Sequence, residues 1–438
     1  MGHIDGKKLY RKLGKKVDNL PTKAPWNEMF YEVLKEIYTE EEADLVVKMP
    51  YGLSELHRIA EVTKYETSQL ESILESLCSK GLVMDIWVND AYYYMPSPIV
   101  IGIFEMSMMR TGPNVDSKKL AHLFHNYLQG DNGAFYEANA ANGKKISPLR
   151  ALPHEDAING FEFVEVLDYE KATSIVESSN KASIGICSCR HEKLHVGEKE
   201  CDVPLEKCSS FGFAADYLIR NNLAREASKS EMLENLAQSR DMKLVLCADN
   251  VKQNITFICH CCKDCCNALA GISKFGYPNI VVTSSFIAKN DPDVCLGCGK
   301  CAKACPIDAI EMVPIENPQT KKKKDAVIDE SICLGCGVCA LQCKNGSVNL
   351  VKREQRVLHP DTTFERIILQ SLERGNLQNQ LFDNPQSICQ KFMRGVVGGF
   401  LRLPPVKASL MSDMLRSSFL NFMQTGVKKQ GKGWLLEL

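Results

Sequence analysis

Along the first hundred residues, apolar side chains recur at the spacing of amphipathic helices. In the last such stretch Leu70, Ile73, Leu74 and Leu77 share one helical face, and Gly81 follows as a helix stop. Two strand-like runs then flank Asn89-Asp90, a pair that favours a two-residue hairpin turn. The predicted helices are Glu28–Tyr38, Glu41–Met49, Leu53–Ala60 and Thr67–Lys80.

The pattern changes after Val100. Two more helices are predicted, Gly102–Arg110 and Asp116–Gln129, followed by a polar loop. From residue 151 to 290 strand-like and helix-like runs alternate, which predicts an α/β layer, and Ser228 with Glu231 forms a capping box before the helix 229–239. The strand-like runs are residues 161–167, 182–187, 243–247, 254–259 and 279–284.

Three or four helices followed by a hairpin resemble a winged helix. Residues 26–100 carry 5 Lys or Arg against 14 Asp or Glu, a net charge of −9. The helix 67–80 offers Glu71 and Glu75 outward against Lys80 alone, and such a surface repels phosphates. The lysines of residues 7–16 compensate in part. We therefore expect a protein-docking or packing element and no nucleic-acid partner, with a redox-sensing winged-helix regulator as an alternative.

Cysteine usage is the feature that stands out. The chain has 438 residues, a net charge of −1 and 20 cysteines, 18 of them from Cys187 to Cys343. The start lacks a signal-peptide core and the apolar runs are too short to span a bilayer, so we expect a cytoplasmic protein. In a reducing compartment clustered cysteines are metal ligands, and so many thiolates favour an anaerobic host.

One cysteine motif occurs twice. It runs Cys295-x2-Cys298-x2-Cys301-x3-Cys305 and returns as Cys333-x2-Cys336-x2-Cys339-x3-Cys343. Three thiolates at this spacing wrap one [4Fe–4S] cube, whereas the fourth cysteine reaches the neighbouring cube. Interspersed glycines allow the turns. The predicted ligand sets are Cys295, Cys298, Cys301 and Cys343 for one cluster, and Cys333, Cys336, Cys339 and Cys305 for the other.

This segment resembles the bacterial two-cluster ferredoxins over roughly 60 residues. The resemblance implies single-electron transfer at low potential, with strands in AIEMVPI and DAVID. Two departures, Lys344 in place of the usual proline and a longer turn over residues 316–324, touch no ligand. Zinc binding is the alternative for these cysteines. The run Lys321–Lys324 is either a solvated loop tip or a steering patch for an acidic redox partner.

A second cysteine field lies upstream, with both C-x-C groups at the ends of strand-like runs. One division assigns Cys187, Cys189, Cys201 and Cys208 to one cluster, and Cys259, Cys262 and Cys265 with Cys261 or Cys266 to another. His191, His195 and His260 are minor candidates. The alternatives are a structural zinc, a single structural cluster, or a reactive site in which Arg190, His191, Lys193 and His195 favour thiolate.

The tail from residue 351 to 438 is predicted to be helical, with 13 basic against 7 acidic residues. Its apolar faces are interrupted by Arg394, Arg402, Lys407 and Arg416. A basic amphipathic helix of this kind lies on a membrane surface or docks into a partner. A third interpretation is that these helices cap the ferredoxin-like module.

The whole chain also resembles the multidomain 4Fe–4S dicluster binding proteins of anaerobic bacteria, which join a helix-turn-helix-like front, a CSCRH…CxCC middle and a ferredoxin end. The fold class expected is a multidomain α+β protein. The predicted parts are a basic arm (1–25), a winged-helix-like domain (26–100), a helical linker (101–150), an α/β cysteine-rich domain (151–290), a 2[4Fe–4S] ferredoxin domain (291–350) and a helical C-terminal region (351–438).

We expect an electron carrier, or an electron-transfer subunit of an oxidoreductase, with two [4Fe–4S] clusters and one or two further iron–sulfur clusters, or zinc, in the middle. Its partner would be a ferredoxin or another redox subunit. The rival hypothesis is an iron–sulfur reductase whose active site lies in the middle cysteine field. No dinucleotide or phosphate-binding fingerprint appears in the sequence, so nicotinamide, flavin or ATP use gains no support.

Overall fold

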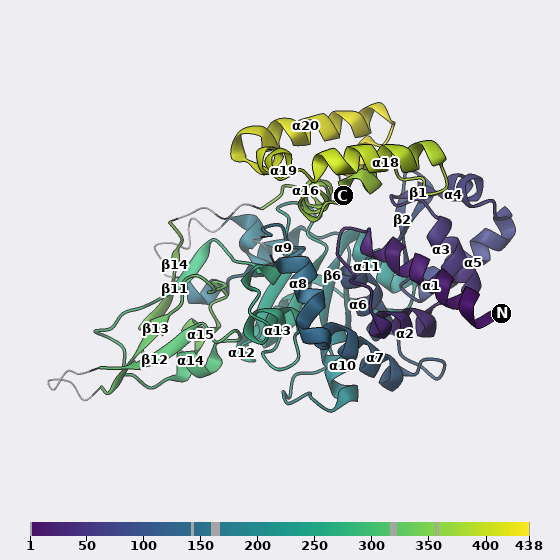
Figure 1. Ribbon diagram of the computed structural model, residues 1–438. Coiled ribbons are helices and arrows are strands. Elements are labelled where there is room, and N and C mark those ends of the chain that lie inside the picture. The colour runs from purple at the N-terminus through teal and green to yellow at the C-terminus, as the bar shows by residue number, and fades with distance from the viewer. Residues whose placement is uncertain are drawn as a thin grey trace.

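The computed structural model describes residues 2–141, 144–158, 167–315, 322–354, 357 and 359–437. It is a mixed helix-and-sheet protein. Figure 1 shows helices of the N-terminal part on one side, a central sheet, an elongated cysteine-rich module projecting on the other side, and the C-terminal helices along the top. Among the described helices, none combines the length and the apolar character needed to cross a bilayer.

The first helix, α1 (Gly2–Asp18), corrects one prediction. The expected basic arm is instead a packed helix, because Tyr10, Leu13 and Val17 are buried in the N-terminal core. Lys16 is buried too: its Nζ donates to the carbonyl oxygen of Met49 and lies 3.6 Å from the centre of the Tyr51 ring. In the sequence, the many lysines of this segment make its apolar helical face hard to recognise.

The predicted helices and hairpin of the N-terminal part are present. Asn89 and Asp90 form the turn with φ of 51° and 58°, as a two-residue hairpin with twisted strands requires. A short strand, β1 (Ser54–Glu55), adds to the hairpin. The winged-helix assignment itself stays a prediction. The elements are α2 (Glu28–Ile37), α3 (Glu40–Lys48), α4 (Leu56–Thr63), α5 (Thr67–Ser79), β2 (Val83–Val88) and β3 (Ala91–Pro96).

The expected linker is part of the same core. Phe104, Phe124 and Tyr136 are buried, and they share one hydrophobic cluster with Phe30 and Leu74. The described residues up to 141 therefore extend the helical domain and do not form a linker. Their helices are α6 (Phe104–Met109), α7 (Ser117–Gln129) and α8 (Ala134–Ala140).

The middle part is built on a seven-stranded sheet with the order β10-β4-β8-β9-β6-β5-β7. Only β10 and β4 pair in parallel, so the predicted α/β layer is largely antiparallel. The short segment between β8 and β9 leaves no room for a crossover helix, which a parallel pair needs. The strands are β4 (Leu149–Leu152), β5 (Ala182–Ile186), β6 (Glu206–Phe211), β7 (Ala224–Glu226), β8 (Val245–Asp249), β9 (Phe257–Cys261) and β10 (Val281–Val282).

Helices flank this sheet, and the predicted capping box is confirmed. The Ser228 side chain accepts from Glu231 N, while the Glu231 side chain accepts from Ser228 N. The predicted strand over residues 161–167 lies, except for Leu167, outside the described residues. The helices are α9 (Ala172–Ser178), α10 (Ser188–Val196), α11 (Gly212–Arg220), α12 (Lys229–Asp241) and α13 (Asn267–Ser273).

The cysteine-rich module contains two antiparallel strand pairs and two short helices. Its first strand starts at Phe286, ahead of the predicted boundary at 291, because β11 pairs with β14 at the end of the module. The core is shared with the middle part: Leu269 and Ile272 lie in one cluster with Leu334 and Leu350. The elements are β11 (Phe286–Asn290), α14 (Lys300–Ala304), β12 (Ile310–Pro314), β13 (Lys324–Ile328), α15 (Val338–Gln342) and β14 (Val348–Lys352).

The tail helices do not cap the cysteine-rich module. Side chains of Gln370 and Asn376 donate to the carbonyl oxygens of Pro21 and Leu20, and Arg58 pairs with Asp383 at 2.6 Å. The interpretation as a cap is therefore wrong, since these polar contacts join the tail to the N-terminal part instead. The tail helices are α16 (Thr363–Arg374), α17 (Leu377–Leu381), α18 (Ile388–Leu401), α19 (Pro404–Met411) and α20 (Asp413–Lys429).

Candidate metal centres

The eight cysteines of the doubled motif are free thiols gathered around the start of α14 and α15. Burial raises the pKa of Cys301, and the nearby sulfurs of Cys295 and Cys343 raise it further. Cys343, from the second motif, therefore lies beside cysteines of the first. Backbone N–H groups already point at sulfur: Gly297 N donates to Cys295 Sγ at 3.4 Å.

The second predicted set surrounds a small internal cavity. Cys305, Cys333, Cys336 and Cys339 all line it, together with apolar side chains such as Ile310. Burial raises the pKa of Cys336 to about 12, and the neighbouring Cys333 and Cys305 sulfurs contribute to that rise. Four thiols around one cavity, one of them from the other motif, fit the donor set of a [4Fe–4S] cube.

Glycine is required in the turns that carry these cysteines. Gly335 has a φ of 65°, and a Cβ there would stand 2.0 Å from the carbonyl oxygen of Phe286. Gly297 is similar, with a φ of 67° and a Cβ position 2.3 Å from the Lys324 oxygen. Both turns therefore need a left-handed backbone and a close approach that only glycine allows.

The two cysteine sets differ in exposure. Cys298 is exposed and Cys295 and Cys343 are half-buried, whereas all four members of the other set are buried. The buried set also lies against the middle domain. Ser284 N donates to the Leu334 carbonyl oxygen at 3.0 Å. One set thus faces the outside and the other faces the central sheet.

Nine cysteines of the middle domain line a cavity of about 950 Å³, whose other walls come from the N-terminal part and the tail. The cavity receives Cys187 and Cys189 from the start of α10, Cys208 from β6 and Cys266 from the start of α13. The full set is Cys187, Cys189, Cys208, Cys247, Cys259, Cys261, Cys262, Cys265 and Cys266.

Cys247 was missed from the sequence because it stands alone there. On β8 it is the register partner of Cys259 on β9, and this places it on the same wall. Glu105 was missed as well. It lines the cavity, and burial raises the pKa of its carboxyl to about 7. Neither residue carries a local motif, so only the strand register and the helix packing reveal them.

The thiols of the middle cysteines meet across the two predicted sets, so the structure favours a different grouping. A hydrogen bond with Cys266 raises the pKa of Cys189, and one with Cys259 lowers the pKa of Cys208. Cys201 does not join Cys187, Cys189 and Cys208. It lies with Cys262 and Cys265 instead.

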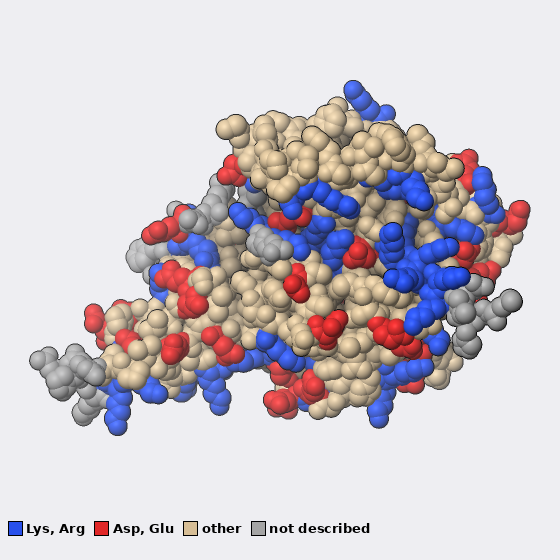
Figure 2. Space-filling view, viewed as in Figure 1, with Lys and Arg blue, Asp and Glu red and all other residues tan. Residues whose placement is uncertain are grey.

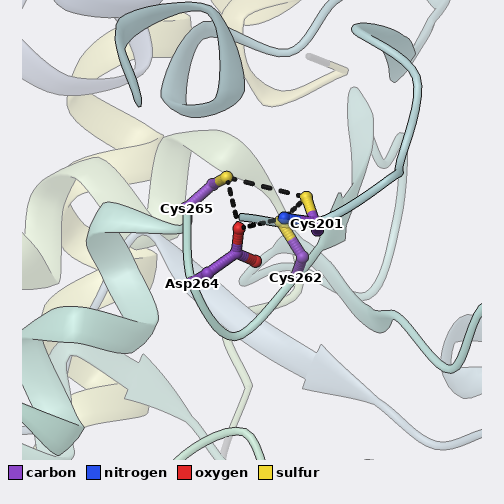
Figure 3. A group of neighbouring side chains, drawn as sticks. All are labelled: Cys201, Cys262, Asp264 and Cys265. Carbon is purple, nitrogen blue, oxygen red and sulfur yellow. Dashed lines mark hydrogen bonds between the residues drawn. The ribbon is translucent and has the colours of Figure 1, made fainter. Parts of the chain in front are cut away.

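Figure 3 shows this separate group, formed by Cys201, Cys262, Asp264 and Cys265. Cys201 Sγ lies 3.5 Å from Cys262 Sγ and 3.7 Å from Cys265 Sγ. Cys265 Sγ lies 3.0 Å from Asp264 Oδ2, which also accepts from the backbone N–H of Cys201 at 2.9 Å. Four donors that could bind a metal ion converge within 4.8 Å of one another.

The three histidine candidates are occupied by protein partners. His260 is buried, with Nε2 bonded to Ser209 and Nδ1 to Ser239. His191 Nδ1 donates to the Met108 carbonyl oxygen at 2.6 Å, and its Nε2 lies 3.0 Å from His195 Nε2. These contacts give the histidines a structural role.

The hypothesis of a reactive thiolate stays a prediction, and one thiol of the group has the electrostatic surroundings that it requires. A hydrogen bond from Cys265, together with the charge of Arg190, lowers the pKa of Cys262 to about 6. Burial instead raises the pKa of Cys187 well above its ordinary value. Lys193 does not act on these thiols, since its Nζ pairs with Glu198 at 2.9 Å. Arg190 is therefore the cation of this site.

Residues 294–347 match the family model of the 4Fe-4S dicluster domain. This match supports a ferredoxin-type module that binds 4Fe–4S clusters, and an electron-transfer role in general. Neither a curated protein nor a solved structure matches the chain. The middle domain and the two helical parts therefore have to be interpreted from their own geometry.

Proposed function

We propose that this chain is an iron–sulfur electron-transfer protein that carries single low-potential electrons between a donor and a partner oxidoreductase. The observation that carries the proposal is the pair of interleaved thiol sets, one exposed at Cys298 and the other buried in one cluster with Cys261 and Cys266 of the middle domain. The clustered free thiols would be kept reduced in the cytoplasm of an anaerobic organism.

The residues of the module fit two [4Fe–4S] clusters, which supply reversible one-electron chemistry when bound. The predicted ligands are Cys295, Cys298, Cys301 and Cys343 in one set and Cys333, Cys336, Cys339 and Cys305 in the other. The protein supplies N–H donors to sulfur, as at Ala309 N to Cys305 Sγ at 3.2 Å. Such donors stabilise the thiolate form.

A redox partner would contact the module around Cys298. Leu296, next in the same turn, is 71% exposed, and Val294 is 43% exposed. Two exposed aliphatic side chains beside an exposed cysteine make a small apolar contact surface, which suits a transient redox complex. The partner class is a ferredoxin or an oxidoreductase subunit.

The cysteine-lined cavity is where we propose one or two further iron–sulfur centres. Cys187, Cys189, Cys208, Cys259, Cys261 and Cys266 are the cavity thiols outside the group around Cys201, with Cys247 behind them. The same cavity supports the second candidate function, an iron–sulfur reductase. Glu105, with a pKa near 7, is a proton donor beside the thiols, and the volume of about 950 Å³ admits a small substrate.

Iron and acid-labile sulfide per chain, measured after anaerobic purification, test the proposal. About eight irons correspond to the module alone, and about twelve or sixteen to one or two further clusters. Reduction by a low-potential donor should then consume one electron per cluster and produce EPR signals. A colourless protein, or zinc at the eight module positions, would refute the electron-transfer proposal.

A cavity variant separates the two candidates. Cys208→Ser should leave the EPR signals of the module intact in either case. For a reductase it should abolish turnover of the substrate, whereas for a carrier the exchange of electrons with a ferredoxin at the Cys298 end should continue at the wild-type rate.

A further inference from the structure

We propose that Cys201, Cys262, Cys265 and Asp264 hold one tetrahedral divalent ion of the zinc type, separate from every iron–sulfur centre. The proposal goes beyond electron transfer, because it assigns a redox-inactive metal to a site of its own. The four residues come from two loops, one after α10 and one between β9 and α13 (Figure 3).

The sulfur spacing indicates a single ion. A zinc–sulfur bond of about 2.3 Å places two thiolates of one tetrahedral ion about 3.8 Å apart. The separations of Cys201 Sγ from Cys262 Sγ and Cys265 Sγ are 3.5 and 3.7 Å. Thiolates of an iron–sulfur cube bind different irons and stand much further apart. These three sulfurs are therefore too close for one cube.

The donor types agree with this spacing. Cys262-x2-Cys265 is the knuckle spacing of structural zinc sites, and a carboxylate is a common zinc ligand. Asp264 lies inside that knuckle, and its Oδ2 accepts from Glu200 N at 3.1 Å and Cys201 N at 2.9 Å. The carboxylate therefore brings the loop that carries Cys201 to the knuckle before any metal arrives.

Arg190 offsets half of the excess charge of such a site. Three thiolates and a carboxylate exceed the charge of a divalent ion by two. Arg190 is fully buried beside Cys262 and Cys187, and its Nε has no hydrogen-bond partner among the described residues. A buried guanidinium with a free donor fits a neighbouring metal thiolate.

The ion would fix the position of the cysteine-rich module. Lys263, within the knuckle, pairs with Asp308 at 2.5 Å, and Asp308 follows Cys305 by three residues. An exposed ion pair of this type contributes little by itself. A metal that holds the knuckle rigid would keep this side of the module at a constant distance from the cavity.

Zinc and iron contents of anaerobically purified full-length protein test the proposal. We expect about one zinc per chain in the wild type, none in Cys201→Ser/Cys265→Ser, and an unchanged iron content in that variant. Cys389→Ser, an isolated exposed thiol of α18, is the matched control and should keep the zinc. Cobalt(II) bound in place of zinc should give the absorption of a tetrahedral thiolate site.

Asp264→Asn tests the fourth ligand, and we expect zinc loss to a chelator to be about tenfold faster than in the wild type. A loss of about four irons in Cys201→Ser/Cys265→Ser would overturn the proposal, because it would assign these cysteines to a cluster. Zinc retained in that variant would overturn it as well. Either result leaves the EPR signals of the module, and so the proposed function, untouched.

A different observation concerns the tail. The outward side of α18–α20 is strongly apolar: Ile388 and Met414 are each 86% exposed, and Phe422 is 74% exposed. Figure 2 shows that the top of the molecule, where these helices lie, is largely uncharged. Further exposed apolar residues are Phe392, Val396, Phe400, Leu403 and Leu415. Large apolar side chains exposed together in this way mark an interaction surface.

The charge of this region favours an anionic occupant. Residues 388–429 carry seven Lys or Arg and one acidic residue, Asp413, so the net charge is +6. Lys391, Lys428 and Lys429 are exposed. The geometry points to binding of α18–α20 to an anionic lipid surface, with the aromatic side chains in the headgroup boundary and the lysines on lipid phosphates.

Co-sedimentation with phosphatidylcholine vesicles, with and without phosphatidylglycerol, tests this binding. The wild type should bind the anionic vesicles and leave them as salt is raised. Phe392→Ser/Phe400→Ser should weaken binding at least about tenfold, because each ring loses apolar contact with lipid. Met242→Ser/Val327→Ser, which removes two exposed apolar residues outside the tail, should bind like the wild type. Equal binding of all variants, or dimerisation through this face without lipid, would overturn the proposal.

Discussion

The backbone N–H of His154 donates to the carbonyl oxygen of Cys336 at 3.0 Å, and both residues are buried. His154 follows β4 of the central sheet, whereas Cys336 is a predicted ligand of the buried set. The contact joins the sheet directly to a ligand turn. The same turn packs on Ala157, which lies 2.7 Å from the Cβ position of Gly337.

This close packing makes Gly335 sensitive to substitution. Gly335→Ala should lower the free energy of unfolding by about 2–4 kcal/mol, because the added Cβ meets the Phe286 oxygen and the φ is positive. Gly346→Ala is the control: φ is 70° there, but no atom lies within 4 Å of the Cβ position. It should cost about 1 kcal/mol in urea unfolding. Equal costs would show that contact with Phe286 is unimportant.

The interleaving of ligands predicts which cluster each fourth cysteine serves. Cys343→Ser should disturb the exposed set with Cys298, and Cys305→Ser the buried set with Cys336. Each variant should lose about four irons, or retain a cluster with an altered EPR signal, and the two altered signals should differ. If instead Cys305→Ser and Cys301→Ser altered the same signal, each motif would hold its own cluster.

Acid should destabilise the protein through His359. Burial lowers the pKa of this ring to about 3, with Arg150 and Lys252 adding to the effect, whereas the pKa in an unfolded chain is about 6.5. As pH falls below 6.5, this ring binds a proton in the unfolded chain but stays neutral in the folded protein. The free energy of unfolding therefore falls until about pH 3. Between pH 6.5 and 5 the loss is about 2 kcal/mol.

His359→Gln should remove that part of the acid sensitivity, which urea unfolding at pH 6.5 and pH 5 measures. His57→Gln is the control, because the His57 side chain is 72% exposed. An unchanged difference between the two pH values in His359→Gln would show that the ring is protonated in the folded protein.

The helical front should not bind duplex DNA at physiological salt. On α5, Glu71 and Glu75 are exposed, and Lys80 is already paired with Glu42 at 2.7 Å. Lys80 is the one cation among these three residues, and its ion pair leaves it unavailable to DNA phosphates. A gel-shift assay of the wild-type protein checks this expectation. The variant Glu71→Lys/Glu75→Lys should gain weak, salt-sensitive binding in the same assay. A wild-type shift at 150 mM salt would favour a redox-sensing regulator.

Local signals predicted what depends on a few neighbouring residues. The Asn89-Asp90 turn, the Ser228 capping box and the spacing of Cys295–Cys305 each follow from residues within one turn or motif. The same holds for most of the helix positions. The prediction of α1 as a basic arm failed because the many lysines drew attention away from Tyr10, Leu13 and Val17, which are buried.

Long-range pairing set the limit for the middle site. Whether Cys201 joins Cys208 or Cys262 depends on where two loops end, which the order of the sheet decides. Cys247 gained its place only through its register with Cys259. Since alternating strands and helices permit several sheet orders, the sequence could single out the thiols as candidate ligands but could not group them.

The contacts of Gln370, Asn376 and Asn379 with residues 19–21 have a consequence for biosynthesis. These carbonyl acceptors leave the ribosome roughly 350 positions before their donors do. During translation the carbonyl oxygens of residues 19–21 therefore stay hydrated until the tail emerges. A chain that ends before α16 would lack these contacts between the tail and residues 19–21. Nascent chains should therefore depend on chaperones up to the final stage of synthesis.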